Sequence, residues 1–396
     1  MSHVLILGGD GYLGWPTAMY FSNRGYQVTV VDNYFRRSAC DELKTGTLYS
    51  VPNLIERAKI WHKQTGNEIK VVIGDLTKPE IVRGLFNGKI KYNWSLSHKF
   101  TGIPETVVHY AEQPSAPYSM IDYKYANKTI LNNLGVTNNL MWALKDFSKE
   151  THLIKIGTMG EYGTPNIDIE EGWIDINHKG RKEKFLYPRQ GNSIYHTSKI
   201  MDTDLLWFGV RTWGLRITDL MQGPVYGIET DETKINKSLF TIFNYDEIFG
   251  TIINRFITQA VAGYPLTIYG MGGQTRGFLN IKDTLQCVYK TSLSPAKHGE
   301  LRIFNQISEI FSINQIAEKV FKIGNDRNHN VKIKNIKNPR SELDEHYYNP
   351  VFKGLEEIGV KPTYFTDDVI NNIFKIVELY KNNIQKDVFF RGIKWQ

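Results

Sequence analysis

Short apolar runs alternate with longer amphipathic stretches along the first 225 residues of this 396-residue chain. Continuous apolar runs such as Val4–Leu7 are typical of strands that are buried on both faces of a parallel sheet. Alternating strands and helices predict a parallel sheet with right-handed crossovers. We expect strands at residues 4–7, 27–32, 71–76, 106–111, 152–158 and 213–220. Helices are expected between them, ending near residue 25 and then over 51–65, 119–147 and 193–209.

The pattern loosens in the second half of the chain. There an amphipathic helix is expected over 249–262, a short strand over 266–270 and a terminal helix over 366–385. The polar stretch 88–104 is expected to be a surface insertion. The length allows one large α/β core and a second lobe. We therefore predict a sheet domain of residues 1–225 and a smaller lobe of residues 226–396, with some of the later chain returning to the first domain.

Composition narrows the class of protein. With 41% hydrophobic and 22% charged residues, the chain is predicted to be globular rather than disordered. The net charge of +7 fits either a lysine-rich surface or a site for anionic substrates, and no block of like charges indicates nucleic-acid binding. Cys40 and Cys287 lie in unrelated contexts, so neither a disulfide framework nor a metal site is predicted. No leader or membrane-spanning run is recognised, so a cytoplasmic protein without membrane contact is expected.

A glycine-rich loop joins the first expected strand to the first helix. It carries three evenly spaced glycines, Gly8, Gly11 and Gly14. Glycine lets the backbone approach a pyrophosphate, which the N-terminus of the following helix attracts. Asp32 ends the second strand, where a carboxylate can accept both hydroxyls of an adenosine ribose. This order predicts a Rossmann-type, doubly wound sheet that binds NAD, although Arg36 and Arg37 could accept the 2′-phosphate of NADP.

Tyr195 and Lys199 are four residues apart on an expected helix, so their side chains share one face. A nearby ammonium lowers the pKa of a phenol, and a phenolate can take a proton from a sugar hydroxyl. The pair alone is more often an ordinary contact on a helix surface. Thr158 changes that interpretation, because it leaves the fifth strand at the edge where parallel sheets bind ligands. With the glycine loop, this set resembles the extended short-chain dehydrogenase/reductases over essentially the whole chain.

Longer motifs in both halves resemble the UDP-sulfoquinovose synthases. They are Glu112–Gln113, Ser115–Asp122, Gly157–Asp168, Asp219–Gly227, Gly270–Gly277, Asn338–Arg340 and Glu345–Asn349. That family uses tightly held NAD to convert UDP-glucose and sulfite to UDP-sulfoquinovose. The resemblance implies oxidation at carbon 4, dehydration across carbons 5 and 6, sulfite addition at carbon 6 and reduction back at carbon 4. It also implies that the smaller lobe binds a nucleotide sugar.

The resemblance assigns the first chemical step to three residues. Tyr195 as a phenolate takes the proton of the sugar 4-hydroxyl, and Lys199 lowers the tyrosine pKa and holds the nicotinamide ribose. Thr158 donates a hydrogen bond to the developing ketone oxygen. The expected cofactor contacts are Gly8, Gly11, Tyr12, Leu13, Gly14, Asp32, Asn33, Arg36, Arg37, Asp75, Leu76, Ala111, Asn133, Tyr195, Lys199 and Val225.

The dehydration needs an acid and a base beyond that triad. Glu161 is three residues after Thr158 and is the candidate, with Met159 shaping the pocket. His196 is a candidate for proton transfer or sulfite contact, or else an ordinary surface histidine. The expected UDP-sugar contacts are Gln113, Thr158, Gln222, Tyr269, Gln274, Arg276, Arg340 and Tyr347, with the two arginines on the pyrophosphate.

Three stretches depart from the family pattern. Where the plant enzymes have arginine after Glu-Gln, this chain has Pro114, so another cation such as Arg189 or Lys124 would have to hold an anion there. The stretch Asn133–Thr137 replaces the family's Asn-x-x-Gly-Thr. The insertion at 88–104 has no recognised counterpart.

Other functions stay open at this point. A nucleotide-sugar 4-epimerase or 4,6-dehydratase would share the triad and the first hydride transfer, although Glu161 favours dehydration. A non-catalytic NAD-binding scaffold is disfavoured by the intact triad. By analogy with related enzymes, a homodimer through the helices near 119–147 and 193–209 is expected. The sequence does not indicate whether a sulfosugar would serve a lipid or a protein glycan.

Overall fold

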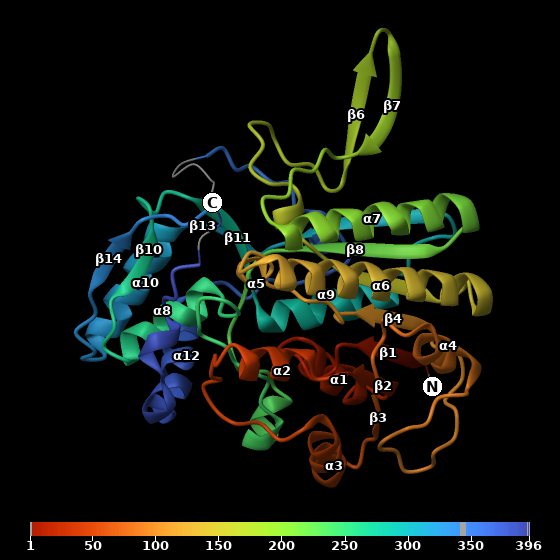
Figure 1. The fold of residues 1–396 in the computed structure, drawn as a ribbon, viewed down its shortest axis with the longest axis horizontal. Helices are drawn as coiled ribbons and strands as arrows, with labels where there is room; N and C mark the ends of the chain where they lie inside the picture. Colours follow the sequence, from red (N-terminus) through yellow and green to blue (C-terminus); the bar gives the residue numbers. More distant parts are fainter. Residues whose placement is uncertain (1, 341–345, 394, 396) are drawn as a thin grey trace.

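A seven-stranded parallel sheet forms the centre of the computed structural model, which describes residues 2–340, 346–393 and 395 (Figure 1). Its strand order is β12-β8-β5-β4-β1-β2-β3. The strands are β1 (His3–Leu7), β2 (Gln27–Asp32), β3 (Ile69–Ile73), β4 (Thr106–His109), β5 (His152–Thr158), β8 (Arg216–Gln222) and β12 (Glu300–Gln306). The predicted doubly wound α/β sheet is confirmed.

Helices cover both faces of this sheet, which explains the continuous apolar runs. On one face lie α1 (Gly14–Ser22), α3 (Leu54–Thr65) and α9 (Ile281–Leu293), which pack with alternate β1 residues such as Val4 and Ile6. On the other lie α4 (Pro79–Asn87), α6 (Tyr123–Phe147) and α7 (Ile194–Trp213), which pack with Leu5 and Leu7. The strand therefore has no polar face along which an alternating pattern could arise.

A second group of elements lies beside the carboxyl edge of the sheet (Figure 1). It contains a three-stranded sheet of β9 (Val225–Tyr226), β11 (Thr275–Asn280) and β13 (Glu309–Ser312), and a pair of β10 (Leu266–Tyr269) and β14 (Ile333–Ile336). Helices α8 (Ile252–Val261), α10 (Ile313–Asp326) and α12 (Asp367–Leu379) share one hydrophobic core. Between these elements the chain returns to the main sheet through α9 and β12.

The remaining elements are short. They are α2 (Phe35–Glu42), α5 (Ala116–Ser119), α11 (Gly354–Glu357), the hairpin of β6 (Trp173–His178) and β7 (Arg181–Leu186), and 3-10 turns at Met159–Glu161, Thr233–Ile235, Lys237–Leu239, Lys381–Asn383 and Lys386–Val388. The hairpin projects from the body of the molecule (Figure 1). Its side chains are mostly exposed, so the sequence has no hydrophobic pattern there that would predict a hairpin.

Some element boundaries differ from the sequence predictions for physical reasons. The strand expected at 213–220 begins only at Arg216, because α7 continues to Trp213 and Gly214 ends it with a φ of +71°. The third strand ends at Ile73, and the terminal helix ends at Leu379. Within the described residues, no helix combines the length and apolarity needed to cross a bilayer.

Candidate active site

The carboxyl ends of the central strands open into one cavity of about 480 Å³. Its walls come from both the main sheet and the second group of elements. Most predicted site residues line it: Gly8, Gly11, Tyr12, Leu13, Gly14, Asp32, Asn33, Arg36, Leu76, Ala111, Thr158, Met159, Tyr195, His196, Gln222, Val225, Tyr269, Gln274, Arg276 and Arg340. Seven others lie outside its lining: Arg37, Asp75, Gln113, Asn133, Glu161, Lys199 and Tyr347.

The glycine loop forms the floor of one end of the cavity. Gly8 has a φ of +85°, and a Cβ on it would lie 2.7 Å from the carbonyl carbon of Tyr110. A Cβ on Gly14 would lie 2.0 Å from the carbonyl oxygen of Gly8. Larger residues at either position would therefore push the loop away from the strand and helix that it joins. The start of α1 faces a loop that can cradle a pyrophosphate.

Asp32 stands beside this loop with its carboxylate held in place. Its oxygens accept hydrogen bonds from the backbone nitrogens of Asp10 (2.9 Å) and Tyr34 (2.6 Å). Burial raises the pKa of Asp32 to about 6, and the nearby Asp10 acts in the same direction. Asp32 lines the cavity at the end of β2, where a ribose of NAD fits.

The two arginines that could have accepted a 2′-phosphate are both engaged. Arg37 binds the carboxylate of Asp10 with Nε at 2.7 Å, and Arg57 binds the same carboxylate at 2.6 Å. Arg36 donates to Asn244 at 3.2 Å and stacks on Phe249. This arrangement fits NAD better than NADP.

Thr158 and Tyr195 meet at the other end of the cavity. Thr158 is the last residue of β5, and Tyr195 is in the first turn of α7, whose N-cap is Ser193. The backbone nitrogen of Tyr195 donates to the hydroxyl of Ser119 at 3.0 Å, which ties α7 to α5. Burial raises the pKa of Tyr195 well above its ordinary value, with Glu112 as the next contributor. The phenol therefore needs help to ionise.

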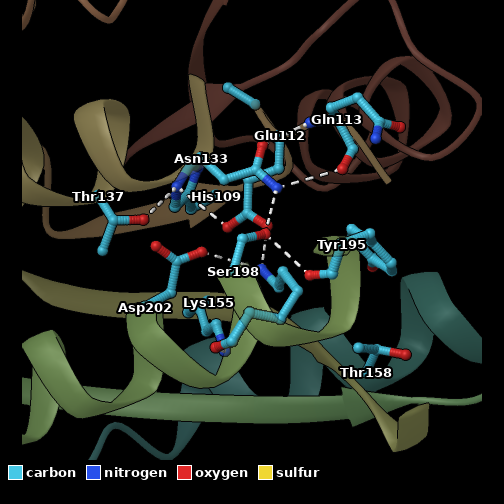
Figure 2. Close-up of polar contacts among 12 residues, drawn as sticks. His109, Glu112, Gln113, Asn133, Thr137, Lys155, Thr158, Tyr195, Ser198 and Asp202 are labelled. Atoms are coloured by element: carbon cyan, nitrogen blue, oxygen red, sulfur yellow. Dashed lines mark hydrogen bonds and ion pairs between the residues drawn. The ribbon is translucent and has the colours of Figure 1, made fainter. Parts of the chain in front are cut away.

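Lys199, which is predicted to lower the pKa of Tyr195, is paired with a carboxylate in this structure. Its fully buried ammonium forms an ion pair with Glu112 and lies 3.8 Å from the carboxylate of Asp202. His109 lies 3.4 Å from the other oxygen of Glu112, and burial raises the pKa of Asp202 to about 8. Figure 2 shows His109 and Asp202 on the side of Glu112 away from Tyr195. The ammonium is thus shared with carboxylates, and one of them, Glu112, lines the cavity.

Replacing Glu112 by glutamine is expected to lower the pKa of Tyr195, because it removes a carboxylate and releases Lys199. If Tyr195 acts as a base, it must be ionised, so a lower pKa moves the acid limb of the kcat/KM profile to lower pH. The measurement is the dependence of kcat/KM on pH. Glu42→Gln is the matched control, since Glu42 forms an exposed pair with Lys128. An unchanged acid limb in Glu112→Gln would contradict this account.

Glu161 lies behind the end of β5 rather than in the cavity. It is fully buried, and its carboxylate accepts from the Thr158 backbone nitrogen (3.1 Å), Lys155 (3.3 Å) and Arg189 (2.8 Å). Lys155 also binds Asp219 at 3.0 Å. Burial raises the pKa of Glu161, while Lys155 and Arg189 oppose the rise. This placement suits a residue that positions Thr158 better than one that exchanges protons with a substrate.

The ion pair with Glu161 also bears on Arg189, which is one suggested substitute for the arginine that plant relatives have in place of Pro114. Arg189 is almost completely buried and is engaged with Glu161. Lys124 is exposed in the first turn of α6. Neither lines the cavity, whereas Pro114 does.

His196 is held in a defined orientation on the cavity wall. Its Nδ1 lies 2.8 Å from the side-chain oxygen of Asn192, which can only accept, so Nδ1 carries the hydrogen and Nε2 a lone pair. Burial lowers the pKa of His196 to about 3, and Arg340 and Arg276 act in the same direction. A Cβ on Gly160 would lie 2.2 Å from Nε2, so glycine at this position lets the imidazole reach the turn after Thr158. A neutral base is thus available in the cavity.

Three polar residues that are expected to touch ligands form hydrogen bonds within neighbouring loops and helices. The Gln113 amide nitrogen donates to Thr129 at 2.9 Å and to the carbonyl oxygen of Ser115 at 3.0 Å. Asn133 bonds both backbone groups of Gln113. The carboxylate of Asp75 accepts from the backbone and hydroxyl of Thr77.

The wall opposite the glycine loop carries the expected substrate residues of the second group of elements. Tyr269 donates to Glu247 at 2.9 Å, and the Gln274 side chain donates to the carbonyl oxygen of Tyr269 at 3.2 Å. Tyr347 is 46% exposed and donates to Asp168, whereas its neighbour Tyr348 lines the cavity. Glu345 of the same motif lies outside the described residues.

Several residues that line the cavity are not among those expected from the sequence. These are Asp10, His109, Glu112, Asn192, Glu247, Arg255 and Tyr348. Glu112 and Tyr348 belong to motifs that were recognised, but which residue of a motif faces inward depends on the local backbone. Among the described residues, no group of three or more His, Cys, Asp or Glu side chains is placed to hold a metal ion, and both cysteines are buried and form no disulfide.

Comparisons with known proteins agree over nearly the whole chain. The NAD dependent epimerase/dehydratase family matches residues 4–305. The chloroplastic UDP-sulfoquinovose synthase of Spinacia oleracea is 43% identical over 393 residues, which are 99% of this chain and 79% of the relative. The UDP-sulfoquinovose synthase of Sulfolobus acidocaldarius is 39% identical over 396 residues, which are 99% and 97% of the two chains.

Solved structures show the same fold at lower identity. The UDP-glucuronic acid 4-epimerase of Bacillus cereus, solved with UDP-glucuronic acid and NAD, has a TM-score of 0.69 at 19% identity. The match covers 95% of this chain and 99% of the epimerase. The UDP-glucose 4-epimerase of Bifidobacterium longum, solved with NAD⁺ and UDP, also has a TM-score of 0.69, at 18% identity, with 96% and 99% of the two chains covered.

Proposed function

The chain belongs to the NAD dependent epimerase/dehydratase family, and from that premise we propose that it is a UDP-sulfoquinovose synthase acting on UDP-glucose and sulfite. The observation that carries the proposal is the identity of 43% and 39% to two such enzymes, over 99% of this chain in each case. The cavity supports it, because a glycine loop, an acid for ribose, Thr158 and Tyr195 share one space.

We divide the first step among residues in and beside the cavity. Gly8, Gly14 and Asp32 would hold NAD, which supplies the hydride acceptor at carbon 4 when it is bound. Tyr195 takes the proton of the 4-hydroxyl, and Thr158 donates a hydrogen bond to the oxygen that becomes the ketone. Lys199 stabilises the phenolate of Tyr195 once the ion pair between Lys199 and Glu112 is weakened.

The later steps need a base that reaches carbon 5 of the sugar. His196 is the candidate for this base because it lines the cavity with Nε2 beside the turn after Thr158, and its lowered pKa means that a bound anion near Arg340 and Arg276 must raise its basicity. The proton taken from carbon 5 can leave with the 6-hydroxyl as water, and sulfite then adds to carbon 6. Glu161 holds the Thr158 backbone in place from behind the strand.

The function is tested by incubating the protein with NAD and UDP-glucose, with and without sulfite. The masses of the products are then measured by mass spectrometry. We expect a sulfonated UDP-hexose only when sulfite is present, with no net accumulation of NADH. Sulfate in place of sulfite is the matched control and should give no sulfonated product. Formation of UDP-galactose alone would identify a 4-epimerase, and a stable UDP-4-keto-6-deoxy sugar would identify a 4,6-dehydratase.

Two further expectations belong to this proposal. Helices α6 and α7 leave large apolar side chains exposed, namely Tyr123, Leu131, Trp142, Met201 and Phe208, which supports a homodimer through these helices. The two buried thiols suit a reducing compartment such as the cytoplasm.

A further inference from the structure

Asp10 lies within the glycine loop, and its carboxylate is shared by two arginines. Oδ2 accepts from Nε of Arg37 at 2.7 Å, and Oδ1 accepts from Nη2 of the same arginine at 2.9 Å. Oδ1 also accepts from Nη2 of Arg57 at 2.6 Å. The side chain of Asp10 is 2% exposed, and the residue lines the cavity. Asp10 is therefore a buried counter-charge for both cations.

Both arginines come from helices that follow the second strand of the sheet. Arg37 belongs to α2 and also donates to two backbone carbonyl oxygens, those of Val51 and Pro52. Arg57 belongs to α3 and is completely buried, and its Nε and Nη1 have no acceptor among the described residues. Within the described part of the chain, Asp10 is the one carboxylate that forms an ion pair with either arginine.

The same aspartate is joined to the residue that is expected to hold the adenosine ribose. The backbone nitrogen of Asp10 donates to the carboxylate of Asp32 at 2.9 Å, and both residues line the cavity. Burial raises the pKa of Asp32 to about 6, and the charge of Asp10 acts in the same direction. Asp10 thus adds negative potential at the place where the ribose of NAD fits.

Cofactor choice at this end of the cavity depends on charge. NADP differs from NAD by a phosphate on the 2′-oxygen of the adenosine ribose, which an arginine near the second strand can accommodate. A guanidinium that is already held by a carboxylate has fewer donors left for a phosphate. The two carboxylates and the two guanidinium groups together carry no net charge, so a 2′-phosphate gains little attraction there.

We propose that Asp10 makes the protein selective for NAD over NADP, because it keeps Arg37 and Arg57 engaged and unable to receive a 2′-phosphate. Asp32 accepts the ribose hydroxyls, and Asp10 is the separate group that silences the cations beside them. The proposal rests on NAD as the cofactor and not on the reaction with sulfite, because it concerns the binding of the dinucleotide alone.

The test measures which dinucleotide the protein retains. The protein is equilibrated with an excess of NAD and NADP in equal amounts, free nucleotide is removed, and bound nucleotide is released with acid and quantified by chromatography. The wild type should retain almost only NAD. Asp10→Asn keeps the size of the side chain but removes its charge. We expect it to lower the ratio of bound NAD to bound NADP by about tenfold to a hundredfold, the range for a charge-assisted hydrogen bond.

Further variants separate this role from a structural one. Adding Arg37→Met to Asp10→Asn removes the released guanidinium, so the ratio should return towards the wild-type value. Asp10→Asn leaves Arg57 without a counter-charge, so its melting temperature should fall, and NADP should restore it more than NAD does. Asp146→Asn is the matched control, since it breaks an exposed ion pair with Arg83 and should leave the ratio unchanged.

An unchanged ratio in Asp10→Asn would overturn the assignment, as would a wild type that retains both dinucleotides equally. A double variant whose ratio stays as low as that of Asp10→Asn would also contradict it. If Asp10→Asn gives no folded protein, Arg37→Met alone decides: the ratio should rise, because the Asp10 carboxylate then has one cation fewer, and an unchanged ratio would refute the proposal. None of these measurements needs sulfite or turnover, so failure of the proposed function would not affect them.

Discussion

Tyr195→Phe is expected to lower turnover of UDP-glucose by about a hundredfold to ten-thousandfold, the usual contribution of a positioned general base. In the proposed mechanism the Tyr195 hydroxyl takes the proton of the sugar 4-hydroxyl, and Tyr195 and Thr158 both line the cavity. The ring itself fills buried space at 9% exposure, and phenylalanine keeps that packing. The NAD content and the melting temperature should therefore stay close to those of the wild type.

A matched control removes a buried tyrosine hydroxyl outside the cavity. Tyr118 on α5 is fully buried, and its hydroxyl has no hydrogen-bond partner among the described residues. Tyr118→Phe should retain turnover. If Tyr195→Phe also kept its turnover, the protein would be either a scaffold or an enzyme with a different base. Loss of bound NAD in Tyr195→Phe would instead indicate a structural defect.

The sequence predicted the central sheet well because its strands are buried on both faces. A run such as Val4–Leu7 contacts helices on both sides, so hydrophobicity alone identifies it as a buried strand. The hairpin of β6 and β7 has the opposite character, since both of its faces are largely exposed and no apolar pattern arises. The seventh strand, β12, was missed because it follows the loosely patterned elements of the second group.

The site was predictable where backbone geometry fixes the chemistry. Glycine at positions 8 and 14 is required by close approaches of the backbone, and Thr158 lies at a strand end. The partners of charged side chains were not predictable in this way. Lys199 turns to Glu112, and the carboxylate of Glu161 turns inward to Lys155. Both contacts join residues from different elements, so they depend on packing that the spacing along the chain does not record.

The inward turn of Glu161 has a measurable consequence for stability. Glu161 stands between two buried cations, Lys155 and Arg189, and a second buried carboxylate, Asp219, shares Lys155. Breaking a buried ion pair by removing one partner leaves an uncompensated charge in a medium of low polarity. Glu161 therefore contributes to the stability of the fold, because its buried partners Lys155 and Arg189 would lose their counter-charge without it. A base that faces the substrate would not have this effect on stability.

Glu161→Ala is expected to lower the free energy of unfolding by about 3–5 kcal/mol, the range for such a broken pair. Glu161→Gln keeps the shape and an acceptor oxygen for the Thr158 backbone, so it should be destabilised less and retain measurable turnover. Chemical denaturation of the NAD-loaded proteins gives the stability, and the rate of sulfonated product formation gives the activity. A Glu161→Gln variant with wild-type stability and no turnover would contradict this account. That result would make Glu161 an acid or base that reaches the substrate, and not the group that holds Thr158 in place.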